Sequence, residues 1–156
     1  MNQNQSSNRI RTIFLTGIVT GILDIGAAIT KFYIETGKGP EPIFRYIASG
    51  VFGRSAFSGG KEMIAWGILF HFIIALLFTT ILLPVFSKVY AIIKNWVAIG
   101  ILYGVVIWAT MNFIVVPLSE VPKPKFDLVQ TLIAAGILII MIGLPVAYVG
   151  KRWFRS

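Results

Sequence analysis

Cysteine is absent from this sequence of 156 residues. Without a thiol, the chain can form no disulfide bond, use no thiolate in catalysis and bind neither an iron–sulfur cluster nor a cysteine-type zinc ion. Histidine is almost absent as well, because His71 is the only one. One imidazole without a thiolate falls short of the usual ligand set of structural zinc. We therefore predict no metal site and no cofactor.

Charged residues are also scarce. They make up 13% of the chain, whereas a soluble domain carries about 25%. Hydrophobic residues reach 56% and the mean hydropathy is +0.83. Because such a chain cannot cover itself with polar surface in water, the sequence predicts an integral membrane protein whose main partner is the lipid bilayer. The length suits a single domain over residues 1–156.

The charges that are present are mostly positive, with 14 Lys and Arg against 6 Asp and Glu. In a soluble protein this excess would suggest nucleic acid. Here the basic residues lie mostly outside the apolar runs, which favours contact with anionic lipid headgroups and membrane orientation. We expect no nucleic-acid partner.

Four long apolar runs predict four transmembrane helices. They cover residues 13–34, 63–86, 96–117 and 128–150. At ~1.5 Å rise per residue each run can cross the ~30 Å hydrocarbon core. Pro145 should kink the last one. The predicted fold is an all-α bundle of four transmembrane helices with a short helix between the first and second spans.

That short helix is expected over residues 43–57, which are apolar but too few to span the bilayer. The segment carries Arg45 and Arg54. Two interpretations stay open. It is either a plain amphipathic helix on the membrane surface, or an interfacial or re-entrant helix in which Arg45 or Arg54 holds an anionic lipid or substrate.

An even number of spans places both termini on one face of the membrane, here called the terminal side; the opposite face is the loop side. Each side has seven basic residues, but all the acids outside the spans fall on the loop side. If Arg45 and Arg54 are embedded rather than free in a loop, the terminal side has the larger number of free basic residues, which is typical of a cytoplasmic face. We therefore expect both termini in the cytoplasm.

Asp24 lies in the middle of the first span. An ionisable group at that depth costs about 2.5–3.5 kcal/mol on insertion scales, so its presence needs a reason. Gly17, Gly21, Asp24 and Ala28 are spaced +4, +3 and +4 and share one helix face. Small residues allow a neighbouring helix to approach closely. Asp24 should therefore face protein rather than lipid.

His71 occupies a similar stripe in the second span, with Gly67 and Ala75. Both residues should lie roughly 12–15 Å from the loop side, given ~1.5 Å per residue. The sequence predicts a polar interior site in which Asp24 and His71 touch and titrate together. Asn112 and Gln130 can join this cluster or hydrogen-bond across helices elsewhere. The pair either fixes helix register or handles protons or ions.

Small-residue pairs also predict where helices pack. We expect Gly17 and Gly21 to pack inside one protomer, because Asp24 shares their stripe and needs a nearby partner. Gly100 and Gly104 in the third span are the better candidates for a contact between protomers in a homo-oligomer.

The run Trp96, Gly100, Gly104, Met111 and Pro117-Leu118, followed by a proline-containing loop, resembles the YagU-type small bacterial inner-membrane proteins. The first span, followed by Lys31, Glu35 and a proline-rich stretch, is also similar. The resemblance implies a helical bundle in a bacterial inner membrane. It implies no biochemical activity and no catalytic residues for this chain.

Three functions are compatible with these patterns. The first is a membrane protein with a polar interior site around Asp24 and His71, in transport or a proton-linked response. The second is a structural or accessory subunit that binds a membrane protein or lipid through its glycine stripes. The third is an intramembrane enzyme acting on lipid, for which no catalytic motif is present.

Overall fold

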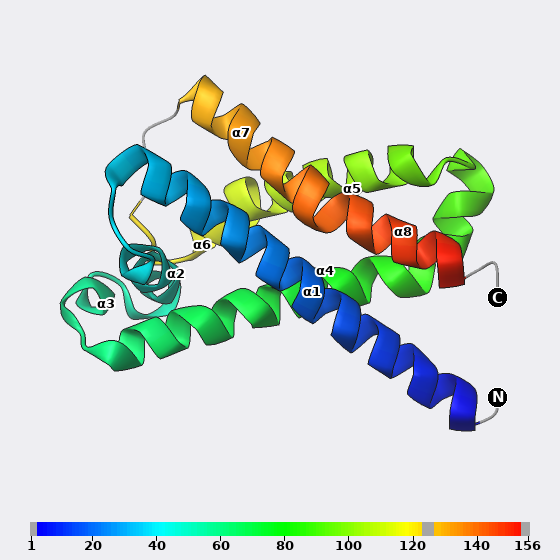
Figure 1. The fold of residues 1–156 in the computed structure, drawn as a ribbon, viewed down its shortest axis with the longest axis horizontal. Coiled ribbons are helices and arrows are strands. Elements are labelled where there is room, and N and C mark those ends of the chain that lie inside the picture. The colour runs from blue at the N-terminus through cyan, green and yellow to red at the C-terminus, as the bar shows by residue number, and fades with distance from the viewer. Residues whose placement is uncertain (1–2, 123–126, 154–156) are drawn as a thin grey trace.

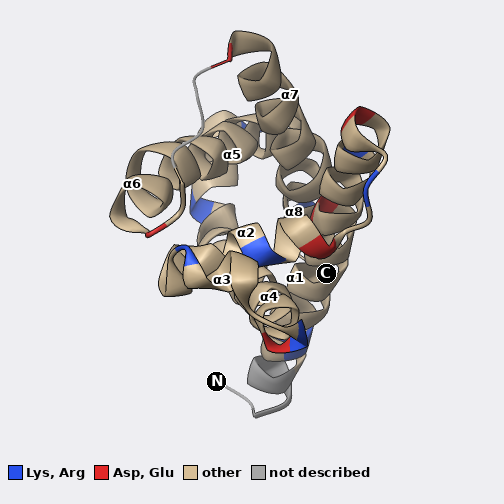
Figure 2. Ribbon diagram, turned by 90° about the vertical axis from the view of Figure 1, so that its left-hand side faces the viewer, with Lys and Arg blue, Asp and Glu red and all other residues tan. Residues whose placement is uncertain are grey.

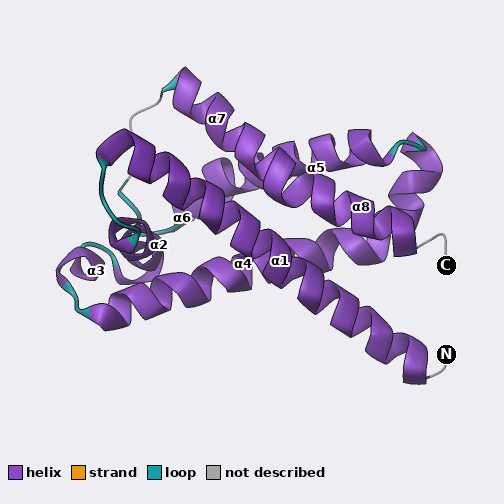
Figure 3. Cartoon of the chain, in the orientation of Figure 1, coloured by secondary structure: helices purple, strands orange, loops and turns teal. Residues whose placement is uncertain are grey.

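The computed structural model describes residues 3–122 and 127–153. All regular secondary structure in these two ranges is helical (Figures 1 and 3). Four stretches are long and apolar enough to span a membrane: Asn8–Thr36, Lys61–Ile93, Trp96–Leu118 and Leu128–Trp153. The prediction of an all-α membrane bundle is therefore confirmed. The first two spanning helices extend further than the apolar runs indicated, because polar residues continue the helix past both ends.

The elements follow one another with short connections. In chain order they are α1 (Gln3–Thr36), α2 (Glu41–Phe52), α3 (Ser55–Ser58), α4 (Lys61–Ile93), α5 (Trp96–Thr110), η1 (Met111–Val115), α6 (Val116–Leu118), α7 (Leu128–Leu138), η2 (Ile139–Gly143) and α8 (Leu144–Trp153). The third span is thus α5–η1–α6, and the fourth is α7–η2–α8.

Local sequence signals explain where the helices begin and end. Pro42 occupies the first turn of α2, where its missing N–H costs no hydrogen bond. Lys94 adopts a left-handed conformation with φ 56° and ends α4. The side chain of Asn95 accepts hydrogen bonds from the N–H groups of Val97 and Ala98 and so caps α5. The chain therefore reverses sharply between the second and third spans.

The third and fourth spans share a local irregularity before a proline. The π-helical turn η1 ends two residues before Pro117, and η2 ends two residues before Pro145. Proline lacks an N–H and its ring crowds the carbonyl four residues earlier, and a widened turn relieves both problems. The sequence predicted a kink at Pro145 but gave no sign of the same irregularity before Pro117.

The first two spans cross in an X, and α2 lies at their diverging ends on the loop side (Figure 1). On the terminal side α4, α5 and the fourth span converge around the apolar core. Its members are almost completely buried: Phe78, Leu82, Leu83 and Phe86 from α4, Ile99, Tyr103 and Ile107 from α5, and Ile142, Val146 and Ala147 from the fourth span.

Large apolar side chains also cover the outside of the bundle. Ile34 is 77% exposed and Ile92 is 82% exposed, and charged residues occupy little of the helix ribbon (Figure 2). A soluble monomer rarely shows such extensive apolar surface. The chain is therefore a small multi-pass membrane protein, as its hydropathy predicted.

Candidate functional site between the first and second spans

The crossing of α1 and α4 depends on two glycines. A Cβ atom added at Gly17 would lie 2.6 Å from Cδ2 and 3.2 Å from Cα of Leu76. One added at Gly21 would lie 2.9 Å from the ring of Phe72. These distances are shorter than ordinary van der Waals contacts, so the two helices can approach this closely only because both positions lack a side chain.

His71 of α4 reaches across this crossing to the backbone of α1. Its Nε2 atom lies 2.8 Å from the carbonyl oxygen of Gly21. A carbonyl oxygen can only accept, so Nε2 carries a hydrogen and donates it. The ring also meets Phe72 edge-on, with centroids 5.4 Å apart. The imidazole is thus held in place by one hydrogen bond and one ring contact.

Asp24 lies half-buried on α1, three residues after Gly21, and its carboxylate interacts electrostatically with His71. Among the described residues it forms no hydrogen bond and no ion pair, and its oxygens keep some accessible surface. The sequence predicted direct contact between the two side chains. The structure instead places both side chains near Gly21 of α1, where the imidazole hydrogen-bonds to the backbone carbonyl and forms no direct hydrogen bond or ion pair with Asp24.

Asn112 and Gln130, which the sequence grouped with this pair, lie elsewhere. Asn112 is exposed, and its Nδ2 donates to the carbonyl of Trp108 in its own helix at 2.9 Å. Gln130 is exposed in the first turn of α7, and its Nε2 donates to Oε1 of Glu35 at 3.2 Å. The four-residue cluster is therefore not assembled, because each amide finds a nearer acceptor.

A second polar group forms at the loop-side end of α1. Lys31 and Glu35 make an ion pair of 2.9 Å, and Glu35 also accepts the hydrogen bond from Gln130. The spacing of Lys31 and Glu35 by four residues could have predicted their pairing. No local signal could have predicted the bond to Gln130, which lies 95 residues further along the chain.

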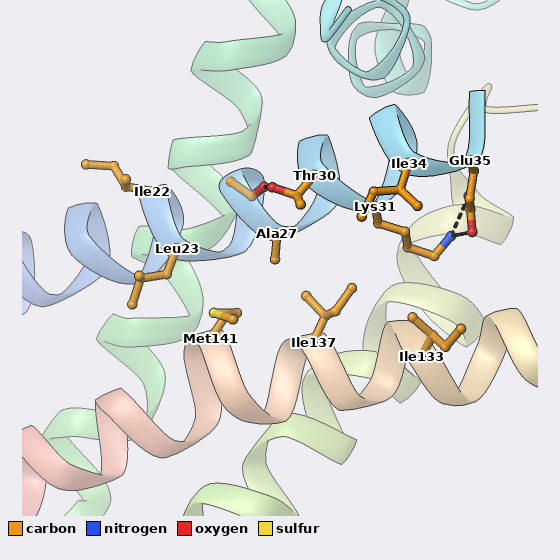
Figure 4. A pocket seen from close by; sticks show the side chains of 11 residues that line it. Ile22, Leu23, Ala27, Thr30, Lys31, Ile34, Glu35, Ile133, Ile137 and Met141 are labelled. Carbon is orange, nitrogen blue, oxygen red and sulfur yellow. Dashed lines mark hydrogen bonds and ion pairs between the residues drawn. The ribbon is translucent and has the colours of Figure 1, made fainter. Parts of the chain in front are cut away.

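A groove between α1 and the fourth span begins at this polar group. It encloses about 670 Å³ and follows α1 from Ile22 to Glu35. Ile133, Ile137 and Met141 form the opposite wall (Figure 4). This groove could not be predicted from the sequence, because its walls come from helices that are not neighbours in the chain.

Arg45 has a structural role in the connection between the first and second spans. Its Nη1 atom donates to the carbonyl oxygens of Ala56, at 3.5 Å, and Phe57, at 3.3 Å, and also to that of Gly59. These bonds hold α3 against α2. Arg54 is exposed, and within the described ranges it makes no hydrogen bond or ion pair. Contact with an anionic lipid therefore fits Arg54 better than Arg45.

The short helix α2 packs directly on α4. A Cβ atom added at Gly67 would lie 2.0 Å from the carbonyl oxygen of Phe44, so Gly67 is where the two helix backbones meet. The predicted short helix thus lies against the second span, and its described range is Glu41–Phe52 followed by the turn α3.

Gly100 and Gly104 pack against the fourth span of the same chain. A Cβ atom added at Gly104 would lie 2.5 Å from Cα of Ile139, and one added at Gly100 would lie 2.9 Å from Cα of Leu144. Both glycines are buried. The expectation that they form a contact between protomers is therefore wrong, and an accessory function through these glycines would need another surface.

No family model, curated protein or solved structure matches this chain. The resemblance of its third span to YagU-type proteins therefore stays a prediction.

Proposed function

We propose that this membrane protein takes up and releases protons at Asp24 and His71, in transport or in a proton-linked response. One observation carries the proposal: a carboxylate in the middle of a span interacts with the only histidine of the chain and has no hydrogen bond among the described residues. Ionisable side chains at this depth commonly belong to proton or ion pathways.

Asp24 differs from the other carboxylate of α1. Glu35 accepts hydrogen bonds from Lys31 and Gln130, whereas Asp24 lies deeper in the span and has no such partner among the described residues. Among the described residues, His71 is the group that interacts electrostatically with the Asp24 carboxylate.

The hydrogen bond of His71 allows the imidazole to change its protonation state in place. Nε2 donates to the Gly21 carbonyl, and it can do so both in the neutral Nε2–H tautomer and in the imidazolium ion. A proton can therefore enter or leave at Nδ1 without loss of the bond that joins α1 to α4. This suits a group that exchanges protons repeatedly.

The position of the pair gives its charge a mechanical consequence. Asp24 follows the tight crossing at Gly17 and Gly21, where α1 and α4 begin to diverge toward the loop side (Figure 1). Attraction between the carboxylate and an imidazolium favours a smaller separation, and loss of either charge removes that attraction. Protonation would thereby be linked to the position of the α1 segment beyond Asp24.

Proton entry into liposomes tests the transport form of this proposal. The reconstituted chain, with a pH-sensitive dye inside, should acidify the lumen faster than protein-free liposomes after an external pH drop. Asp24→Asn should abolish the excess rate. Asp127→Asn is the matched control, because Asn caps α7 as well as Asp does, and it should behave as the wild type. Equal rates with and without the wild-type chain would exclude proton transport.

We further infer a bacterial inner membrane with both termini in the cytoplasm. The membrane is inferred from the resemblance to YagU-type proteins, and the orientation from the charge asymmetry, since the terminal side carries basic residues and no acids outside the spans. A phosphatase reporter fused to the C-terminus should be inactive, and a fluorescent reporter at the same place should fluoresce. An active phosphatase at the C-terminus would contradict this orientation.

A further inference from the structure

We infer that the groove between α1 and the fourth span binds one acyl chain of a bilayer phospholipid whose headgroup carries a primary ammonium. Lys31 would hold the phosphate, and Glu35 would hold the ammonium. This site is separate from the Asp24–His71 pair, since neither residue lines the groove.

The walls of the groove are apolar and open to the side. Ile22 is 55% exposed, Ile34 is 77% exposed and Ile133 is 40% exposed, and all three line the cavity. Because α1 and the fourth span both cross the membrane, the opening faces hydrocarbon rather than water. The nearest available occupant is therefore a lipid chain.

The length of the groove suits a single acyl chain. It follows α1 from Ile22 to Glu35, about 20 Å at the rise of an α-helix. One leaflet of the hydrocarbon core is ~15 Å deep, so an acyl chain that starts at a headgroup beside Glu35 can follow the apolar walls of the groove toward Ile22.

The charges at the mouth select the headgroup. The groove has one cation, Lys31, and one anion, Glu35, both at its loop-side end. A purely anionic headgroup would suit Lys31 but meet repulsion from Glu35. A zwitterion with a phosphate and an ammonium can pair with both, and a primary ammonium also donates hydrogen bonds to the carboxylate. A quaternary ammonium has no N–H to donate.

Glu35 is already oriented for this role. Gln130 of α7 donates to its Oε1 at 3.2 Å, which links the two walls of the groove at its mouth. Gly26 marks the floor of the cavity on α1, and a Cβ atom added there would have no heavy atom within 4 Å. The groove therefore has an open apolar interior and a fixed polar end.

Native mass spectrometry of the purified full chain tests this site. The probes are phosphatidylethanolamine, phosphatidylcholine and phosphatidylglycerol with identical dioleoyl chains, supplied in equal amounts. The ethanolamine lipid should be retained up to about fivefold more than either of the others, as expected from the one exposed ion pair with Glu35 that it alone completes with hydrogen bonds. Equal retention of all three, or a preference for phosphatidylglycerol, would overturn the headgroup assignment.

Two glycine variants locate the lipid. Gly26→Leu should fill the groove and remove lipid retention. Gly136→Leu is the matched control, because it also adds a leucine to a helical position with open space but does not line the cavity, and it should retain lipid. If both variants retain lipid equally, the site lies elsewhere. If the wild type retains none and is a dimer that Gly26→Leu dissociates, a second copy occupies the groove.

The charge variants separate this site from the proposed function. Lys31→Gln combined with Glu35→Gln should equalise the three lipids, and a persisting ethanolamine preference would overturn the role of the ion pair. Asp24→Asn should retain the ethanolamine lipid as the wild type does. Loss of lipid in Asp24→Asn would contradict a separate site.

Discussion

The two halves of this bundle are built differently. On the terminal side Leu83, Phe86 and Val146 are 0% exposed, and a Cβ atom added at Gly143 would lie 2.2 Å from the carbonyl oxygen of Gly100. On the loop side α2 packs tightly on α4 at Gly67, but α1 and the fourth span leave a groove between them. There Gly26 has no heavy atom within 4 Å of an added Cβ. The comparison teaches that close packing joins the helices of the terminal side, whereas the loop side leaves room between the first and fourth spans for a ligand.

The largest change in stability is expected from replacing glycines within the fourth span, which tests the difference in packing between its two ends. Gly143→Ala should lower the free energy of unfolding by about 2–3 kcal/mol, because overpacking against a backbone forces helices apart. Gly136→Ala should raise it by about 0.5–1 kcal/mol, since alanine favours helix and the position is open. Thermal unfolding in one detergent measures both. Similar losses at the two positions would mean that the halves are equally tight.

A double-mutant cycle with Asp24→Leu and His71→Leu measures how strongly these two residues interact where α1 crosses α4. The coupling free energy should be about 1 kcal/mol, in the range of residues that interact. His71→Leu should be the more damaging single change, because it removes the bond to Gly21 and leaves Asp24 without its counter-charge. Strictly additive effects would show that the two residues do not interact.

The last test concerns the connection between the first two spans on the loop side, which Arg45 stabilises by hydrogen bonds. Arg45→Gln should lower the free energy of unfolding by about 1 kcal/mol, since it removes hydrogen bonds to three backbone carbonyls. Arg54→Gln is the control and should change it by under about 0.5 kcal/mol, as is usual for an exposed side chain. If Arg54→Gln proves as costly as Arg45→Gln, the connection between the first two spans is held in another way.

Hydropathy and helix-breaking residues predicted the four spans and the short helix, because each signal is local to its element. The placement of Asp24 and His71 on facing helices also followed from depth and from the small residues around each. The helix that packs against a pair of glycines could not be predicted from the sequence. Gly100 and Gly104 indicate that a helix comes close, but not whether it belongs to the same chain. The groove and the bond of Gln130 to Glu35 needed the tertiary arrangement, since they join the first span to the fourth.

The central claim is that Asp24 and His71 share a proton-exchanging site, and the single histidine makes one measurement decisive. In the full chain labelled with ¹⁵N-histidine, the imidazole resonances belong to His71 alone. Asp24→Asn should shift these resonances relative to the wild type at the same pH, because it removes the carboxylate with which the ring interacts. Asp127→Asn should leave them unchanged. Resonances that coincide in the wild type and in Asp24→Asn across the whole pH range would contradict the account.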